Sequence, residues 1–173
     1  MITNLIDFFN HPFFICVGGL TTLLAVIALL CTAFNVAKGL LPVWFRLGMG
    51  LSKRKIAILA EDEASGLRDL LVDSRLFDAK NIFLVGKESL KKAESATMML
   101  VHWKPFESQL DQILQIKKDS DALIIYAPQK EGFLGEDDMA KLTSQRHTII
   151  VNFRGRLLND IYTSMITTSY EKG

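Results

Sequence analysis

Cysteine and histidine are scarce in this sequence. The two cysteines, Cys16 and Cys31, both lie within one apolar stretch near the N-terminus, so the rest of the chain has neither a disulfide framework nor a cysteine-based zinc site. The three histidines, His11, His102 and His147, are too far apart in sequence for a local metal motif. We therefore expect no metal site built on these residues.

Recognised catalytic motifs are absent as well. The sequence has no GxGxxG dinucleotide fingerprint, no GxxxxGK[ST] phosphate loop and no GxSxG nucleophile elbow. Its 20 basic and 19 acidic side chains give a net charge of +1, so no overall basic field favours nucleic acid as a partner. We expect no cofactor, and the sequence leaves an enzyme open without favouring one.

Charge is nearly missing from residues 1–52, which contain only Asp7, Lys38 and Arg46. The stretch from Phe13 to Phe34 is uncharged, and its helical length of roughly 33 Å matches a hydrocarbon core of about 30 Å. A buried soluble helix would show a polar face, and a cleaved signal peptide would begin with basic residues; this stretch has neither. The pattern predicts a transmembrane helix and the lipid bilayer as a partner.

Basic residues follow the apolar stretch, at Lys38, Arg46 and 53–55. The positive-inside rule then places this side in the cytoplasm of a cell inner membrane and the N-terminus outside, in a single-pass topology. Trp44 and Phe45 suit the headgroup layer, so we expect an interfacial helix or a bent linker there. The predicted parts are an extracytoplasmic tail over 1–12, a transmembrane helix over 13–37, a linker over 38–52 and a cytoplasmic domain over 53–173.

Small residues recur within the predicted membrane helix, at Gly18, Thr22, Ala25 and Thr32. Small residues on one face let two membrane helices approach closely, so this stripe predicts a homo-oligomer. The alternative is that glycine and threonine are simply common in such helices.

Beyond residue 52, short apolar runs alternate with helical patterns. The runs are rich in Ile, Leu and Val, as expected for strands covered on both faces. They lie at 55–60, 81–86, 96–101, 122–127 and 148–153, with helices expected at 65–77, 88–93, 106–118, 135–146 and 155–169. This alternation predicts an α/β, flavodoxin-like three-layer domain with a five-stranded parallel sheet in the order 2-1-3-4-5.

Ligands of such sheets bind at the carboxyl ends of the strands, near the switch point between strands 1 and 3. Asp62, Glu63 and Ser65 follow the first run. Together with Glu61, the carboxylates are suitable ligands for a divalent cation. The favoured alternative is that they are helix N-terminal acids, with Ser65 as the cap.

The third run leads into His102, Trp103 and Lys104, and the fourth ends at Tyr126. A base can stack on the indole, and the ammonium group can meet a phosphate. Alternatively, Trp103 covers the sheet edge or packs against a neighbouring subunit.

The fifth run is followed by two arginines on either side of a glycine, Arg154 and Arg156, after Asn152. Guanidinium groups at a strand-to-helix turn favour an anion, because the free backbone N–H groups there already attract one. The alternative is a pair of salt bridges, such as Arg156 with Asp160 one turn later.

The segment from Lys55 to Leu71 resembles the start of a response-regulator receiver domain, in which acids after the first strand bind Mg²⁺. Asp62 and Glu63 match those acids. The phospho-accepting aspartate has no counterpart at the end of the third strand. Tyr126 or Ala127 replaces the family's Ser or Thr after the fourth strand, and Asn152 replaces its Lys after the fifth. The resemblance implies a pseudo-receiver without phosphorylation chemistry.

Residues 55–173 are also similar in layout to Toll/interleukin-1 receptor (TIR) domains and other Rossmann-like sensor domains, whose membrane-anchored versions occur in bacterial signalling and phage defence. Enzymatic TIR domains cleave NAD with a glutamate on the helix after the third strand. This resemblance implies Glu107 as the catalytic candidate, with Trp103 as the stacking face.

The sequence therefore supports three hypotheses. The favoured one is a membrane-anchored sensor or effector that binds a nucleotide-like or anionic ligand, or a partner protein, at the strand ends and signals through self-association. The alternatives are a TIR-like NAD or nucleotide hydrolase and a non-enzymatic membrane scaffold that docks a partner protein.

Overall fold

The computed structural model describes residues 12–52 and 54–169. The predicted tail, apart from Pro12, and the basic residue Lys53 lie outside the described residues. The chain forms two compact units, residues 1–46 and 47–173.

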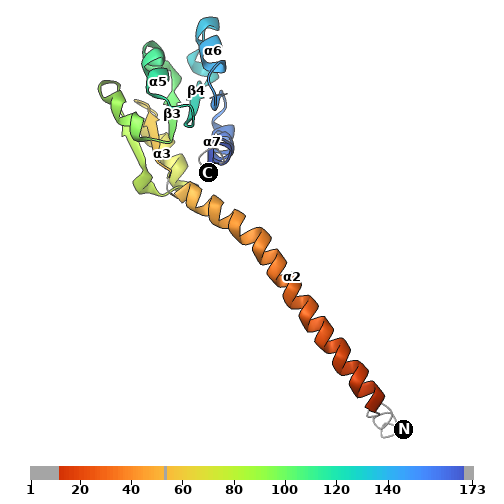
Figure 1. The fold of residues 1–173 in the computed structure, drawn as a ribbon. Helices are drawn as coiled ribbons and strands as arrows, with labels where there is room; N and C mark the ends of the chain where they lie inside the picture. The colour runs from red at the N-terminus through yellow and green to blue at the C-terminus, as the bar shows by residue number, and fades with distance from the viewer. Residues whose placement is uncertain (1–11, 53, 170–173) are drawn as a thin grey trace. The chain divides into compact units, whose positions relative to one another are not determined.

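The first described element is helix α2, Pro12–Ser52, which contains 41 residues (Figure 1). Its stretch Ile15–Pro42 has 28 residues and a mean hydropathy of 2.3, and none of it is buried by the protein. This is one apolar helix near the N-terminus that is long enough to cross a membrane, a property that signal sequences share. Residues 38–52, where the sequence left an interfacial helix or a bent linker open, continue the same helix through Pro42.

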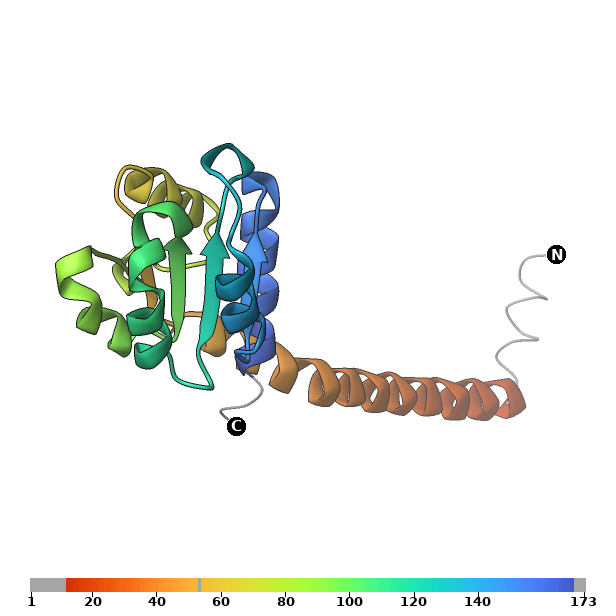
Figure 2. The same cartoon turned by 90° about the horizontal axis from the view of Figure 1, so that it is seen from above.

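The second unit contains a five-stranded sheet in which all neighbours pair in parallel (Figure 2). The strand order β2-β1-β3-β4-β5 confirms the predicted flavodoxin-like topology. The change of direction between β1 and β3 creates a switch point at the carboxyl ends of the strands. The strands are β1 (Ile56–Leu59), β2 (Ile82–Val85), β3 (Met98–His102), β4 (Ala122–Tyr126) and β5 (Thr148–Val151).

Helical segments connect successive strands. The predicted helix over 106–118 is divided, because Phe106 and Gln109 both leave helical backbone angles, with φ −109° and ψ near 10°. The segments are α3 (Ala64–Asp73), η1 (Ala79–Asn81), η2 (Lys87–Ser95), α4 (Trp103–Phe106), η3 (Glu107–Gln109), α5 (Leu110–Ile116), η4 (Gln129–Glu131), α6 (Glu136–Thr143) and α7 (Arg154–Ser169).

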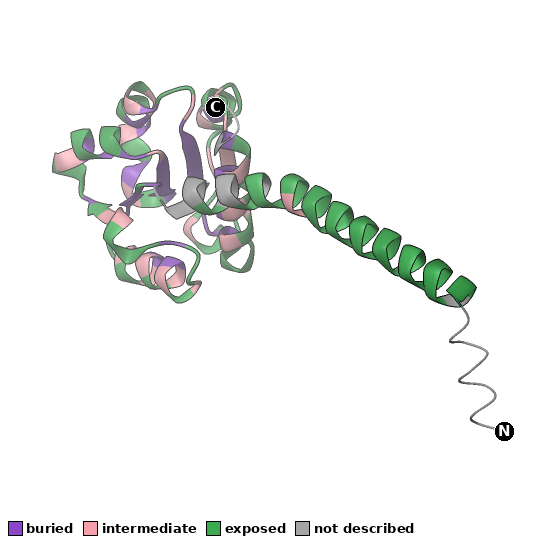
Figure 3. Ribbon diagram, turned by 60° about the horizontal axis from the view of Figure 1, so that its bottom comes forward, coloured by how far each residue is buried: buried purple, intermediate pink, exposed green. Residues whose placement is uncertain are grey.

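Alternate residues of each strand pack against opposite helical layers. Ile56 and Ile58 of β1 contribute to one apolar cluster with α3 and α7, whereas Ala57 and Leu59 contribute to a second cluster with η2, α4, α5 and α6. Burial is accordingly concentrated in the strands, while the described part of α2 is exposed almost throughout (Figure 3). Both clusters lie entirely within residues 56–165, so the domain contains its own core without the apolar helix.

Candidate functional site

Side chains from four strand ends meet at the carboxyl edge of the sheet. We call Glu63, His102, Tyr126, Glu131 and Arg154 the carboxyl-edge network. Glu63 lies between β1 and α3, His102 ends β3, Tyr126 ends β4, Glu131 ends η4, and Arg154 begins α7. Parallel strands bring these residues together although they are spread over much of the domain sequence.

The Arg154–Glu63 ion pair links α7 to the N-terminus of α3. Arg154 Nη1 lies 2.5 Å from Glu63 Oε2, and the two side chains are 43% and 29% exposed. Gly66 makes room for the guanidinium, because a Cβ at this position would lie 2.8 Å from Arg154 Nη2. Glu63 is therefore the native partner of Arg154, and an anionic ligand must compete with this carboxylate.

The His102–Glu131 contact links β3 to η4. His102 Nε2 lies 2.7 Å from Glu131 Oε2, and the imidazole is almost completely buried. We assign the hydrogen to Nε2, since the carboxylate can only accept, and this leaves Nδ1 of a neutral ring as an acceptor. Nδ1 has no hydrogen-bond partner among the described residues, so a water or a ligand donor is needed to satisfy it.

Tyr126 lies between these two pairs. Its ring is 5.7 Å from that of His102, centroid to centroid, and only 4% of the residue is exposed. Burial raises the pKa of the Tyr126 phenol, the charge of Arg154 opposes this effect, and Glu63 and Glu131 reinforce it. The phenol is therefore kept neutral and serves the network as a hydrogen-bonding group rather than as a charge.

The remaining acids after β1 do not group around a cation. Glu61 Oε1 pairs with Lys87 Nζ at 2.9 Å, while Asp62 is exposed. Within the described residues there is no group of three or more His, Cys, Asp or Glu side chains that could hold a metal ion. The prediction of Ser65 as the helix cap is wrong, because α3 begins at Ala64 and Glu63 occupies the N-cap position.

Trp103 and its neighbours occupy a different environment from the network. The indole is 3% exposed and belongs to the second apolar cluster, so the predicted stacking face is covered by the protein's own core. This supports the alternative of a packing role. Lys104 is exposed and pairs with Glu107 at 2.9 Å, one turn away. Glu107 thus binds a local lysine and has no described bond to the carboxyl-edge network.

Asn152 and Arg156 lie beside the network, on the edge formed by β5. Asn152 is exposed, and Arg156 Nη2 lies 4.0 Å from Asp160 Oδ1, which is the i,i+4 ion pair that the sequence left open. These residues line a small cavity of about 190 Å³ along β5. Of the two arginines, only Arg154 contacts the network.

Sequence reasoning missed Glu131, Gly66 and Lys87. Glu131 and Lys87 are charged residues in short 3₁₀ segments, η4 and η2, and no local pattern distinguishes them from solvated surface charges. Gly66 matters because of a close approach by a side chain 88 positions later, which spacing alone does not reveal.

No family model, curated protein or solved structure matches the chain. Its function must therefore be argued from the geometry of the domain.

Proposed function

We propose that the chain is a membrane-anchored sensor or effector whose domain binds a small ligand with an anionic group, such as a nucleotide, at the carboxyl-edge network. The observation that carries this proposal is the position of Arg154. Its guanidinium is partly exposed, lies at the N-terminus of α3 and stands on the edge where sheets of this topology bind ligands.

Ligand binding would act by exchange of ion pairs. An anionic group that takes the place of Glu63 on Arg154 releases the link between α3 and α7. The native pair is partly exposed, and such pairs contribute only about 0–1 kcal/mol, so a ligand that makes two charge-assisted hydrogen bonds can displace it.

Helix α7 would carry this change toward the membrane anchor. It begins at Arg154 in the network, and near its other end Thr168 Oγ1 accepts a hydrogen bond of 2.6 Å from Arg54 Nη1. This bond is buried, and Arg54 lies only two positions after Ser52, the last residue of α2. A shift of α7 is thus coupled by direct bonds to the segment that leaves the domain.

Self-association of α2 in the bilayer would be the output. On an ideal helix, Gly18, Thr22, Ala25 and Thr32 fall within an arc of about 80°. The Thr22 and Thr32 hydroxyls donate to carbonyls of their own helix, at 2.7 and 2.8 Å. Their polar atoms are therefore already satisfied in lipid, and the stripe is free to pack closely against a second helix.

The test is thermal unfolding of residues 53–173 against NAD and mono-, di- and cyclic nucleotides. A ligand at about 100 times its Kd adds roughly 2.7 kcal/mol to the free energy of unfolding and raises the Tm. Arg154→Gln should abolish the shift, and Glu63→Gln should enlarge it, because the competing carboxylate is gone. Lys141→Gln removes an exposed charge on α6, where Lys141 pairs with Asp111 rather than with the network, and it should leave the ligand-induced shift unchanged. A shift that survives Arg154→Gln, or no shift with any of these compounds, would refute the proposal.

Docking of a partner protein at the same edge is a second candidate, supported by two exposed aromatic side chains. Phe133, in the loop before α6, is 84% exposed, and Phe153, directly before α7, is 56% exposed. Aromatic residues are enriched among interface hot spots. Under this alternative, a stoichiometric partner co-purifies with the full chain and is lost in Phe133→Ser/Phe153→Ser, whereas nucleotides produce no thermal shift.

A further inference from the structure

The amino edge of the sheet, opposite the carboxyl-edge network, contains an open groove of about 670 Å³ that is rich in lysine. We call it the lysine groove. It is lined by Lys55, Lys80, Asn81, Phe83, Lys91, Lys92, Glu94, Ser95 and Lys118.

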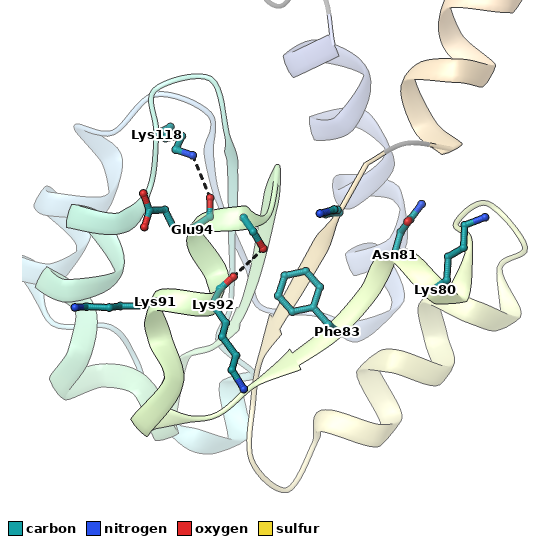
Figure 4. A pocket seen from close by; sticks show the side chains of 9 residues that line it. Lys80, Asn81, Phe83, Lys91, Lys92, Glu94 and Lys118 are labelled. Atoms are coloured by element: carbon teal, nitrogen blue, oxygen red, sulfur yellow. Dashed lines mark hydrogen bonds between the residues drawn. The ribbon is translucent and has the colours of Figure 1, made fainter.

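Segments that precede four different strands build this groove. Lys55 directly precedes β1, Asn81 precedes β2, Ser95 lies before β3 and Lys118 lies before β4. Lys118 Nζ donates to the backbone carbonyl of Glu94 at 3.1 Å, which holds the loop before β4 against η2. Figure 4 shows Phe83 in the middle, with Lys80 and Asn81 on one side and Lys91, Lys92 and Lys118 on the other.

The ammonium groups of the groove are largely uncompensated. Among the described residues, only Lys80 of the five lysines forms an ion pair, with Asp78 at 2.7 Å. Glu94 is the one carboxylate in the lining, so the groove carries a formal charge of +4. Residues 53–173 hold 18 basic and 18 acidic side chains and are neutral as a whole. This charge is therefore a local concentration, matched by an excess of acids elsewhere in the domain.

An anion bound in the groove would be attracted by the ammonium groups of the surrounding lysines. Lysine is a compact point charge on a flexible stem, so several lysines can converge on the oxygens of a phosphate. The half-buried ring of Phe83 forms an apolar floor between them. We propose that the lysine groove binds a phosphate-bearing ligand, as a site separate from the carboxyl-edge network.

Two sources can supply such a phosphate. One is a free phosphorylated metabolite. The other is the headgroup of an anionic lipid, since Lys55 follows the last residue of α2 by only three positions in the sequence, and basic residues that follow a membrane helix in sequence attract anionic lipids. The chemistry of recognition is the same in both cases.

The experiment uses inorganic pyrophosphate and phosphatidylglycerol vesicles as probes. Titration calorimetry with pyrophosphate and vesicle co-sedimentation are run on residues 53–173, which contain the complete core. Lys91→Gln/Lys92→Gln removes two exposed charges from the groove and should weaken binding about tenfold. Glu94→Gln removes the repelling carboxylate and should strengthen it. Raising the salt from about 0.1 M to about 1 M should abolish binding, as the Debye length falls from about 10 to about 3 Å.

The control is Lys130→Gln/Lys141→Gln, which removes two exposed lysine charges outside the groove and should leave binding unchanged. Binding of pyrophosphate identifies a free phosphate ligand, and binding to vesicles alone identifies a lipid headgroup. The proposal is overturned if the wild-type domain binds neither probe, or if the control pair weakens binding as much as Lys91→Gln/Lys92→Gln does. Binding that depends on Arg154 but not on the groove lysines would equally overturn it.

Discussion

Gly66→Ala offers a direct test of the geometry around Arg154. A Cβ at position 66 would lie 2.8 Å from Arg154 Nη2, whereas an ordinary contact is 3.4 Å or more. The guanidinium must therefore shift by roughly 0.6 Å, and we expect this shift to weaken its 2.5 Å contact with Glu63. The substitution perturbs the ion pair without changing any charge.

Two effects of this substitution oppose each other. Alanine in place of glycine within α3 stabilises the helix by about 0.5–1 kcal/mol. Loss of the partly exposed Arg154–Glu63 pair costs about 0–1 kcal/mol. In the native background the free energy of unfolding should thus change little. When Arg154 is already alanine, nothing obstructs the new methyl group, and the full helix gain should appear.

The assay is urea or thermal unfolding of four variants of residues 53–173: native, Gly66→Ala, Arg154→Ala and the double substitution. The coupling energy equals the loss of the ion pair, so it should reach up to about 1 kcal/mol, which corresponds to up to roughly 4 °C in Tm for a domain of this size. Equal stabilisation by Gly66→Ala in both backgrounds would show that the guanidinium does not lie over α3, and the argument for its role at the carboxyl edge would fail.

Three further predictions concern the core, the phenol and α7. Leu100→Ala in the buried β3 should cost about 2–5 kcal/mol in urea unfolding, whereas Leu84→Ala, 48% exposed on β2, should cost far less; equal losses would contradict the burial of β3. Tyr126 favours its neutral form in the fold, so its stability contribution is complete below the unfolded pKa and is lost as pH rises through the raised folded pKa. Spectroscopic titration should show one phenol that ionises at a higher pH than the other tyrosines, and Tyr126→Phe should remove this transition. A titration curve that Tyr126→Phe leaves unchanged would contradict the raised pKa of Tyr126. Thr168→Val should preserve ligand binding at Arg154 but weaken ligand-induced self-association of the full chain in cross-linking; an unaltered response would exclude α7 as the link.

Much of the fold could be predicted because it depends on local patterns. The apolar runs have the length and composition of doubly covered strands, and right-handed crossovers leave few sheet orders for five of them. The ends of helices were harder to predict from the sequence, since Glu63 rather than Ser65 is the N-cap residue of α3. The division of the segment after β3 arises from backbone angles at Phe106 and Gln109 that no periodicity encodes.

For the candidate site, the sequence predicts the location at the carboxyl edge of the sheet but not the contacts between its side chains. The sheet order brings His102, Tyr126 and Arg154 to one edge, which the alternation of strands and helices indicates. It does not indicate which charge each residue meets. Glu63 and Arg154 are 91 positions apart, and their pairing depends on the fit of one side chain over Gly66.

The lysine groove was missed for a related reason. Its lysines are distributed from position 55 to position 118, and only Lys91 and Lys92 are adjacent in the sequence. Only the parallel sheet, which collects the starts of β1, β2, β3 and β4 at one edge, concentrates them. A neutral total charge thus concealed a strongly basic surface.

The two edges of the sheet serve different tasks in this interpretation, and α7 connects them. Its first residue pairs with Glu63 at the carboxyl edge, while Thr168 near its end accepts a hydrogen bond from Arg54 at the amino edge. Burial lowers the pKa of Arg54 and the charge of Asp121 opposes this effect, so the guanidinium is held by its partners at some desolvation cost. A buried charged group that is bound to only a few partners resists small displacements, because losing one bond leaves the charge unsatisfied. Exchange of the Glu63 pair by a ligand would therefore be transmitted through α7 to Arg54, two positions after α2, rather than absorbed in a flexible loop.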